Sequence, residues 1–166
     1  MRLLLLRHAK ADRPAGVADG DRPLARRGRE DADRVGAYLA AEGLVPDRVI
    51  VSAAARTRET CARVLAAVKA SPAVAEEPRL YEATSDAILA VLAEADLAGT
   101  VLAIGHNPGF HETAVRLAGG GDRDGLLRLS QGFPTAALAV FDLPDGVAPT
   151  DGAGRLERLV LPRDGG

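Results

Sequence analysis

The sequence predicts an α/β fold, a three-layer αβα sandwich with a mostly parallel central sheet. Apolar runs of strand length alternate along the chain with longer stretches whose apolar residues recur at helical spacing. The apolar run near the N-terminus is continuous rather than alternating, as in a strand that is buried on both faces of a parallel sheet. At 166 residues the chain has the length of one domain, which we expect to span residues 1–166.

The first half of the chain is expected to hold two strands and two helices. The apolar residues 3–6 form the first strand, which stops at an arginine and a histidine. A polar loop with turn-forming residues follows over residues 12–21. The remaining expected elements are a helix over residues 25–42, a strand over residues 48–51 and a helix over residues 55–69.

The second half is expected to continue this alternation and to end in a meander. Residues 78–81 are expected to form a short strand or extended segment, and the three glycines at 119–121 a flexible break. Ser85 is a plausible N-cap for the helix that begins there. The other expected elements are helices over residues 85–95 and 108–117, strands over residues 100–104, 136–143 and 156–161, and a frayed end at Gly165 and Gly166.

The composition argues against several classes of protein. The net charge is −2 and the arginines are spread along the whole chain, so a stripe that binds nucleic acid is not expected. The single cysteine allows no internal disulfide and suits a reducing compartment. The first apolar run is too short for a signal peptide or a membrane span. We therefore expect a cytoplasmic protein with neither a nucleic-acid nor a membrane partner.

Polar side chains follow three of the expected strands directly. The first strand ends at Arg7 and His8, the second at Ser52 with Arg56 shortly after it, and the third at His106. Because the carboxyl ends of parallel strands meet at one edge of a sheet, we expect these side chains to share one site. Two of the three histidines of the chain would then lie in that site.

These residue types suit the transfer of a phosphoryl group to nitrogen. The planar fork of an arginine matches phosphate oxygens, so Arg7 and Arg56 are candidate ligands of the phosphoryl group. Nearby cations lower the pKa of a histidine, which would leave His8 neutral with a lone pair free to attack phosphorus. His106 would donate a further hydrogen bond to the phosphoryl oxygens. This chemistry requires neither a metal nor another cofactor, and we expect none.

Four motifs in this order resemble those of the histidine phosphatase superfamily, which has a phosphoglycerate-mutase-like fold. They are Leu6-Arg7-His8-Ala9, Asp21-Arg22-Pro23-Leu24 followed by Arg27-Gly28, Ser52 with Arg56 through Thr60, and Gly105-His106-Asn107-Pro108. The short length, the Arg-His-Ala-Lys-Ala opening and Phe133-Pro134-Thr135 are similar to the SixA-type phosphohistidine phosphatase branch.

The resemblance implies His8 as the phosphorylated nucleophile. It implies that the phosphoryl group is bound by Arg7, Arg56 and His106. By the same match, Arg22 is expected to reach into the pocket and to contact the substrate.

Two departures from the family pattern concern the space around the nucleophile. Ala9 stands where the family has a glycine, and it adds a methyl group without changing a donor or an acceptor. The inserted segment that covers the site in larger members has no counterpart between Ser71 and Ser85. Glu82 is the candidate acid in that stretch, where it would either protonate the leaving group or lie solvated in the loop. Asp21 is another candidate acid, although we expect it rather at the entry of the helix or paired with an arginine. A site without a strong acid would suit a phosphoramidate.

Other side chains near these motifs have simpler explanations. We expect Ser52 to cap the helix that follows it rather than to donate to the phosphate. Arg58 is expected to be a solvated or ion-paired surface residue. His111 is poorly aligned with His106 for a metal pair and is expected at the surface or at the rim of the site. Cys61 is expected to be a small buried apolar residue.

The leading hypothesis is a metal-independent phosphatase that works through a phosphohistidine intermediate on His8. An open site would admit a phosphohistidine carried by a protein, for example a phosphotransfer domain. The alternative substrate is a small phosphorylated metabolite, such as a sugar or nucleotide phosphate, which would make the chain a phosphomonoesterase. A phosphate-binding regulatory module with little turnover is a further hypothesis.

Overall fold

The computed structural model describes residues 1–163, so the predicted frayed end at Gly165 and Gly166 lies outside the described residues. Its strands are β1 (Arg2–Arg7), β2 (Arg48–Val51), β3 (Ala73–Glu76), β4 (Thr100–Gly105), β5 (Ala118–Gly121), β6 (Leu138–Asp142) and β7 (Gly154–Val160). Its helices are α1 (Arg26–Ala41), α2 (Ala55–Val68), α3 (Ser85–Glu94), α4 (Gly109–Leu117) and α5 (Arg123–Gln131), with 3₁₀ turns η1 (Asp19–Asp21) and η2 (Pro78–Leu80).

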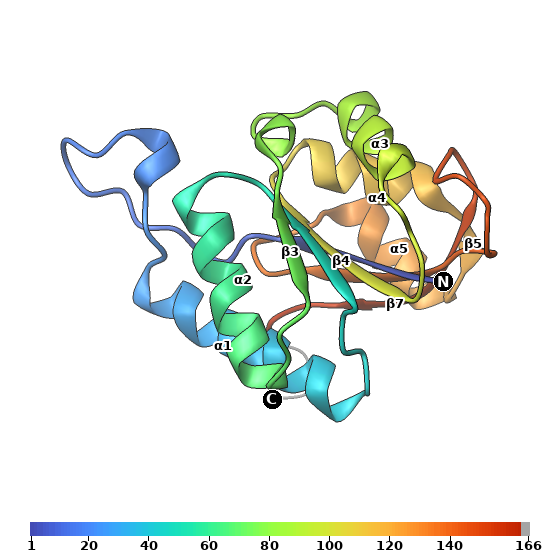
Figure 1. The fold of residues 1–166 in the computed structure, drawn as a ribbon, viewed down its shortest axis with the longest axis horizontal. Coiled ribbons are helices and arrows are strands. Elements are labelled where there is room, and N and C mark those ends of the chain that lie inside the picture. The colour runs from blue at the N-terminus through green and yellow to red at the C-terminus, as the bar shows by residue number, and fades with distance from the viewer. Residues whose placement is uncertain (164–166) are drawn as a thin grey trace.

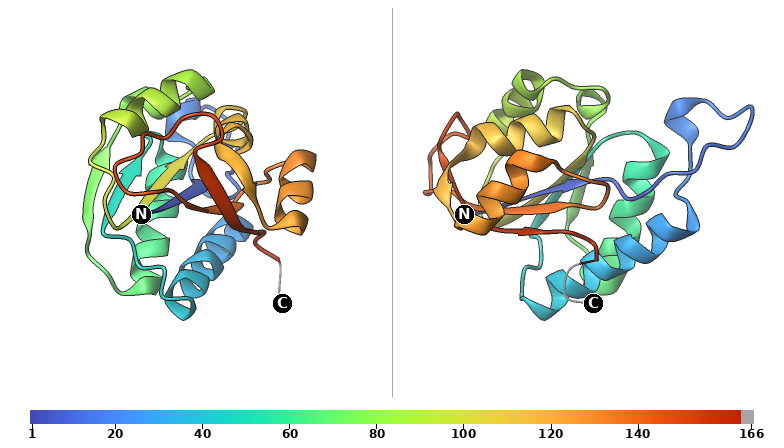
Figure 2. Two further views of the ribbon diagram at one scale, coloured as in Figure 1. Left: turned by 90° about the vertical axis from the view of Figure 1, so that its right-hand side faces the viewer. Right: turned by 180° about the vertical axis from the view of Figure 1, so that it is seen from behind.

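The strands form one sheet in the order β3-β2-β4-β1-β6-β7-β5. The pairs β3–β2, β2–β4, β4–β1 and β7–β5 are parallel, whereas β6 is antiparallel to both β1 and β7. Helices α1 and α2 cover one face of the sheet, and α3, α4 and α5 cover the other (Figures 1 and 2). The predicted three-layer fold with a mostly parallel sheet is therefore confirmed.

Side chains of β1 alternate between two apolar cores, one on each face of the sheet. Leu3 and Leu5 pack in the core that contains residues of α3, α4 and α5. Leu4 and Leu6 pack in the core that contains residues of α1 and α2, including Cys61, which is buried as predicted. All four leucines are fully buried, which explains why their run shows no polar alternation.

Two predictions for the segment between β2 and α3 were wrong. Residues 78–81, expected as a short strand or extended segment, contain the 3₁₀ turn η2 over Pro78–Leu80. The strand of this region is β3, which pairs with β2 as the outermost strand of the sheet. All four residues of β3 are exposed, so they lack the apolar pattern that marks a buried strand. The N-cap of α3 is Thr84 rather than Ser85, because the Thr84 hydroxyl accepts a hydrogen bond from the backbone N–H of Ala87 at 3.2 Å.

The glycines expected as a flexible break instead form most of β5, which pairs in parallel with β7. A Cβ atom at Gly121 would lie 2.1 Å from the carbonyl oxygen of Leu156, so the close approach of the two backbones requires glycine there. Helix α5, which was not predicted, begins directly after this strand. The carboxylate of Asp122 caps it by accepting a hydrogen bond from the N–H of Gly125 at 2.8 Å.

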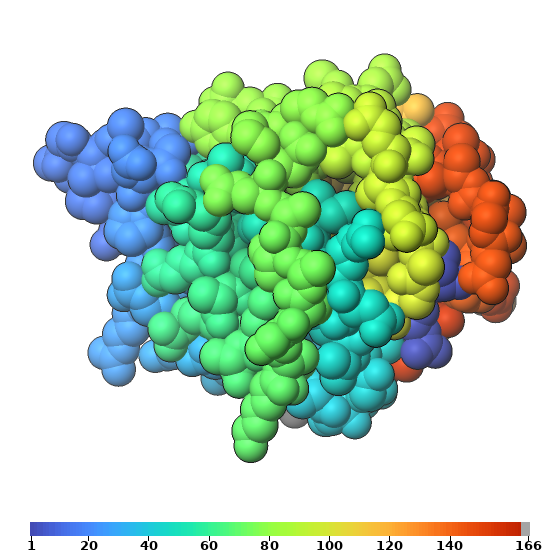
Figure 3. Space-filling model, viewed as in Figure 1, coloured from blue at the N-terminus to red at the C-terminus, as the bar shows by residue number. Residues whose placement is uncertain are grey.

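The carboxyl ends of β1, β2 and β4 lie next to one another, at the same end of the strands. The backbone N–H of His8 donates to the carbonyl of Gly105 at 3.0 Å, and the N–H of Ser52 donates to the carbonyl of Ile104 at 3.1 Å. The polar loop that carries η1 projects from this end of the molecule (Figures 1 and 3). None of the helices within residues 1–163 is long and apolar enough to cross a membrane.

Candidate active site

His8 lies directly after β1, with 8% of its surface exposed. Its Nδ1 lies 2.8 Å from the carbonyl oxygen of Ala9. Because a carbonyl only accepts, Nδ1 carries the proton and Nε2 of the neutral ring keeps its lone pair. Burial lowers the pKa of His8 to about 3; the charges of His106, Arg56 and Arg7 add to this effect and the contact with Ala9 opposes it. The predicted depression of the pKa by cations is thus a smaller effect than burial.

His106 follows β4, and its ring centroid lies 5.3 Å from that of His8. Its Nε2 lies 2.7 Å from the hydroxyl oxygen of Ser52. Burial lowers the pKa of His106 to about 4, with the charge of Arg56 as the second cause, so this ring is neutral as well at pH 7. Ser52 does not cap α2, because the N-cap is Ala54 and that end of the helix has no side-chain cap. Its hydroxyl is directed to His106 instead, in a fully buried position.

Two arginines, Arg7 and Arg56, lie in the site together with the two histidines. The guanidinium of Arg7 donates to the carbonyl of Phe133 at 3.2 Å, and that of Arg56 donates to the carbonyl of Asp19 at 2.8 Å. The Nε atoms of both arginines and Nδ1 of His106 are buried without a hydrogen-bond partner among the described residues. Buried donors without an acceptor are rare in proteins, so the two arginine Nε–H groups point to a site for an anion.

Thr60 of α2 holds the segment of His8 against the segment of Arg56. Its hydroxyl donates to the carbonyl of Arg56 at 2.7 Å and accepts a hydrogen bond from the N–H of Ala9 at 3.1 Å. Thr60 is fully buried, so the N–H of Ala9 depends on this hydroxyl rather than on water, whereas the carbonyl of Arg56 also accepts a hydrogen bond within α2. Sequence reasoning included Thr60 in a family motif but gave it no role in the site.

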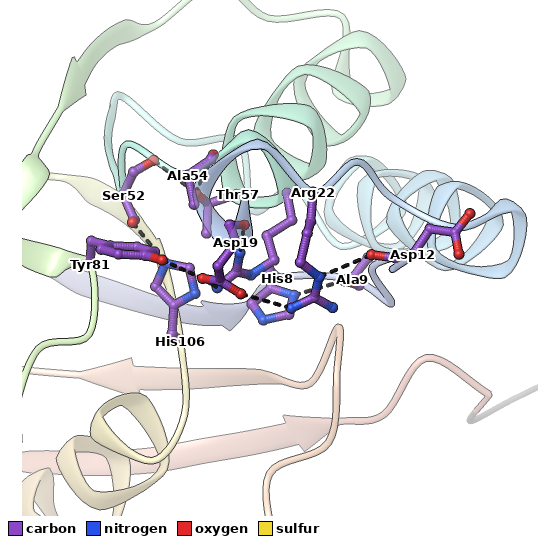
Figure 4. Close-up of polar contacts among 11 residues, drawn as sticks. His8, Ala9, Asp12, Asp19, Arg22, Ser52, Ala54, Thr57, Tyr81 and His106 are labelled. Atoms are coloured by element: carbon purple, nitrogen blue, oxygen red, sulfur yellow. Dashed lines mark hydrogen bonds and ion pairs between the residues drawn. The ribbon is translucent and has the colours of Figure 1, made fainter. Parts of the chain in front are cut away.

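A carboxylate that sequence reasoning did not single out lies at the mouth of the site. Asp19 pairs through Oδ1 with Arg22 at 3.1 Å and through Oδ2 with Arg56 at 3.2 Å, and Oδ2 also accepts a hydrogen bond from the hydroxyl of Tyr81 (Figure 4). Arg22 also donates from Nε to the carbonyl of Asp12 at 3.0 Å. Arg22 therefore contacts the loop carboxylate at the mouth, and its contact with substrate stays a prediction.

The other candidates, all of them described residues, make no hydrogen bond with either imidazole. Glu82 is exposed, with a φ of 52°, and its carboxylate makes no hydrogen bond or ion pair with residues 1–163. Asp21 is likewise exposed and its carboxylate has no such partner in the described chain, so the expected pairing with an arginine is wrong. Arg58 is exposed as predicted, and His111 stacks on Phe133 with ring centroids 6.3 Å apart, behind the carbonyl that Arg7 contacts. The role of Glu82 as an acid stays a prediction.

No metal centre is evident in the described part of the chain. Residues 1–163 contain no group of three or more histidine, cysteine or carboxylate side chains arranged to hold a metal ion. Cys61 lies in a core, and burial raises the pKa of its thiol to about 11, so it is not a thiolate at neutral pH. The arrangement of two neutral imidazoles and two arginines is thus suited to nucleophilic chemistry on an anion.

Comparison with known sequences identifies a family. The sequence model of the histidine phosphatase superfamily (branch 1) matches residues 3–89. An uncharacterised protein of Mycobacterium tuberculosis is 37% identical over 139 residues, which cover 82% of this chain and 85% of the relative.

Solved structures resemble the whole chain. A candidate phosphohistidine phosphatase SixA from Agrobacterium tumefaciens has a TM-score of 0.82 and 31% sequence identity, covering 96% of this chain and 97% of that chain. A candidate phosphohistidine phosphatase SixA from Nakamurella multipartita has a TM-score of 0.76 and 32% identity, covering 98% of this chain and 96% of that chain. The likeness therefore extends beyond the segment that the family's sequence model matches.

Proposed function

The chain belongs to the histidine phosphatase superfamily, branch 1, which supports phosphatase activity, and we propose that it hydrolyses a phosphohistidine carried by a protein. The reaction proceeds through a phosphohistidine intermediate on His8 and needs no metal. The observation that carries this proposal is the tautomer of His8, whose Nδ1 is held at 2.8 Å by the carbonyl of Ala9. Nε2 is thereby left with its lone pair, in a site where the Nε–H donors of Arg7 and Arg56 have no partner among the described residues.

In the first step, Nε2 of His8 attacks phosphorus and the bond from phosphorus to the substrate breaks. Arg7 and Arg56 bind the phosphoryl oxygens, because their Nε–H groups are buried and without an acceptor. In this proposal the hydroxyl of Ser52, 2.7 Å from Nε2 of His106, is the donor of their hydrogen bond, so the proton of the ring is on Nδ1 and can be donated to a phosphoryl oxygen. In the second step, water attacks the phosphorus on His8 and inorganic phosphate is released.

The preference for a protein substrate rests on two observations. The solved structures with 31% and 32% identity are both described as candidate phosphohistidine phosphatases. At the mouth of the site, Asp19 and Glu82 are exposed and Tyr81 is partly exposed, so a group on the surface of another protein can approach. A phosphotransfer domain is the kind of partner that presents a phosphorylated histidine in this way.

A comparison of substrates tests the proposal. Initial rates are measured on a phosphotransfer domain phosphorylated on histidine and on a panel of sugar and nucleotide phosphates, with the His8→Gln variant as the control. We expect a higher kcat/KM on the phosphorylated domain, no turnover by the variant and no effect of a chelator such as EDTA. A higher kcat/KM on a small phosphate ester would reject the protein substrate, and inactivation by EDTA would reject the metal-free reaction.

A further inference from the structure

The carboxylate of Asp19 lies at the entrance to a site that otherwise presents donors and cations. Its two oxygens contact Arg22, Arg56 and the hydroxyl of Tyr81. Its side chain is nevertheless 47% exposed, so it also faces whatever approaches the opening. In Figure 4 the carboxylate lies between the Tyr81 hydroxyl and the Arg22 guanidinium. A site built to bind a phosphoryl dianion thus carries a fixed negative charge on its outer side.

Asp19 shares this opening with His106. The ring of Tyr81, which donates to Asp19, lies edge-on to the ring of His106 with centroids 5.5 Å apart. The guanidinium of Arg56 lies 5.9 Å from the centroid of the same tyrosine ring. A phosphoryl group on the donors of Arg56 and His106 would therefore have its bond to the substrate near the Asp19 carboxylate.

This carboxylate has no proton to give to a leaving group. The hydrogen bonds from Tyr81 and Arg22 hold the pKa of Asp19 well below its usual range, and Arg56 adds to the effect. Because it stays ionised at neutral pH, Asp19 acts on a departing group through its charge. It attracts a group that is cationic before the bond breaks and repels one that leaves as an anion.

From this arrangement, and resting on the proposed function, we propose that Asp19 selects phosphoramidates whose leaving group is a protonated imidazole over phosphate esters of alcohols. Asp19 stabilises the imidazolium form of a substrate phosphohistidine at the mouth of the site. That form is the reactive one, because its ring departs as a neutral imidazole. Asp19 is thus a specificity-determining residue rather than a general acid.

The charges balance in the step that this selection favours. A bond forms between Nε2 of His8 and phosphorus while the bond from phosphorus to the substrate imidazolium breaks. The bonding pair stays on the substrate nitrogen and neutralises that ring, which keeps the proton on its other nitrogen. The positive charge moves to the phosphorylated ring of His8. With an alkyl phosphate, the departing oxygen would become negative beside Asp19, where the carboxylate has no proton to neutralise it.

The Asp19→Asn variant tests the proposal, since it keeps the shape of the side chain and an oxygen acceptor but removes the charge. Its kcat/KM is compared with that of the wild-type protein on a peptide that carries phosphohistidine and on p-nitrophenyl phosphate, whose leaving group departs without a proton. We expect the ratio of the two kcat/KM values to fall about tenfold, the order expected for one unit charge at a half-exposed position. We also expect the alkaline limb of the pH profile on the phosphohistidine peptide to move to lower pH.

Asp21→Asn is the matched control, because it removes the same charge from the same turn and its carboxylate makes no hydrogen bond or ion pair with a described residue. An unchanged ratio in this variant, with the reduced ratio in Asp19→Asn, supports the proposal. Equal changes on both substrates in Asp19→Asn, or the same ratio change in Asp21→Asn, would overturn it. A wild-type protein that forms no phosphorylated His8 would overturn the proposed function itself, which separates that failure from a failure of the role of Asp19.

Discussion

The imidazole rings of His8 and His106 lie with their centroids 5.3 Å apart and their planes inclined by 55°. The parallel register of β1 and β4 explains this proximity, because Arg7 pairs with Gly105 and each histidine is the next residue of its chain segment. Both rings are buried, with 8% and 7% exposed. Two imidazoles this close, beside Arg7 and Arg56, are both more stable as neutral rings.

The first prediction concerns the dependence of stability on pH. The ordinary pKa of histidine is 6.5, and burial lowers that of His8 to about 3 and that of His106 to about 4. Between the ordinary pKa of 6.5 and these lowered pKa values, the unfolded chain binds more protons than the folded protein. The contribution of these two neutral rings to the free energy of unfolding is therefore fully present above pH 6.5. It is lost as the pH falls toward 4 for His106 and toward 3 for His8.

At pH 5, each of the two histidines is expected to lower the free energy of unfolding by about 2 kcal/mol relative to its value at high pH. The variants His8→Gln and His106→Gln should each lose about that much less stability between pH 7 and pH 5 than the wild-type protein. Urea denaturation at the two pH values measures this difference. Identical losses in the wild-type protein and both variants would contradict neutral, buried imidazoles.

The second prediction concerns Ser52, whose hydroxyl fixes the tautomer of His106 in the proposed reaction. Ser52→Ala removes the partner of Nε2, so the ring can place its proton on either nitrogen. We expect kcat to fall about tenfold with little change in KM, an order typical of a lost positioning hydrogen bond. ¹⁵N NMR of the His106 ring should show the proton on Nδ1 in the wild-type protein and a mixture of tautomers in the variant.

Ser71→Ala serves as the control, because Ser71 is an exposed serine outside the site. Unaltered ring signals in Ser52→Ala would show that another contact sets the tautomer.

The third prediction concerns Thr60, whose hydroxyl serves the Ala9 N–H and the Arg56 carbonyl. Thr60→Val keeps the shape of the side chain but leaves the buried N–H of Ala9 without a partner, at a cost of about 1–3 kcal/mol. We expect lower stability in urea and weaker binding of inorganic phosphate, because Arg56 and His8 are no longer held together. Thr60→Ser keeps the hydroxyl and should retain most of both properties. A valine variant as stable as the serine variant would rule out this role.

The elements around the site were predictable because buried parallel strands have a strong sequence pattern. The run of four leucines in β1 and the apolar residues of β4 each stop where a histidine follows, and parallel pairing brings those ends together. The missed elements lack such a pattern. Strand β3 is exposed throughout, and β5 consists of one alanine and three glycines, whose place in the sheet is decided by backbone contacts with β7.

The position of Asp19 was not predictable to the same degree. The loop before Arg22 contains Asp12, Asp19 and Asp21, and the sequence does not show which carboxylate turns toward the site. The spacing of three residues between Asp19 and Arg22 is the one signal that could have pointed to their ion pair. The turn η1 decides the outcome, because it directs Asp19 to Arg56 while Asp21 stays exposed. Tertiary placement of an irregular loop of this kind leaves little trace in one sequence.

Trapping the covalent intermediate tests the central claim most directly. The protein is mixed with a phosphotransfer domain that carries ³²P-labelled phosphohistidine, quenched in alkali, in which phosphohistidine is stable, and mapped by mass spectrometry. We predict label on Nε2 of His8 in the wild-type protein and none on the His8→Gln variant. Label on another residue, or full turnover by the His8→Gln variant, would contradict the account.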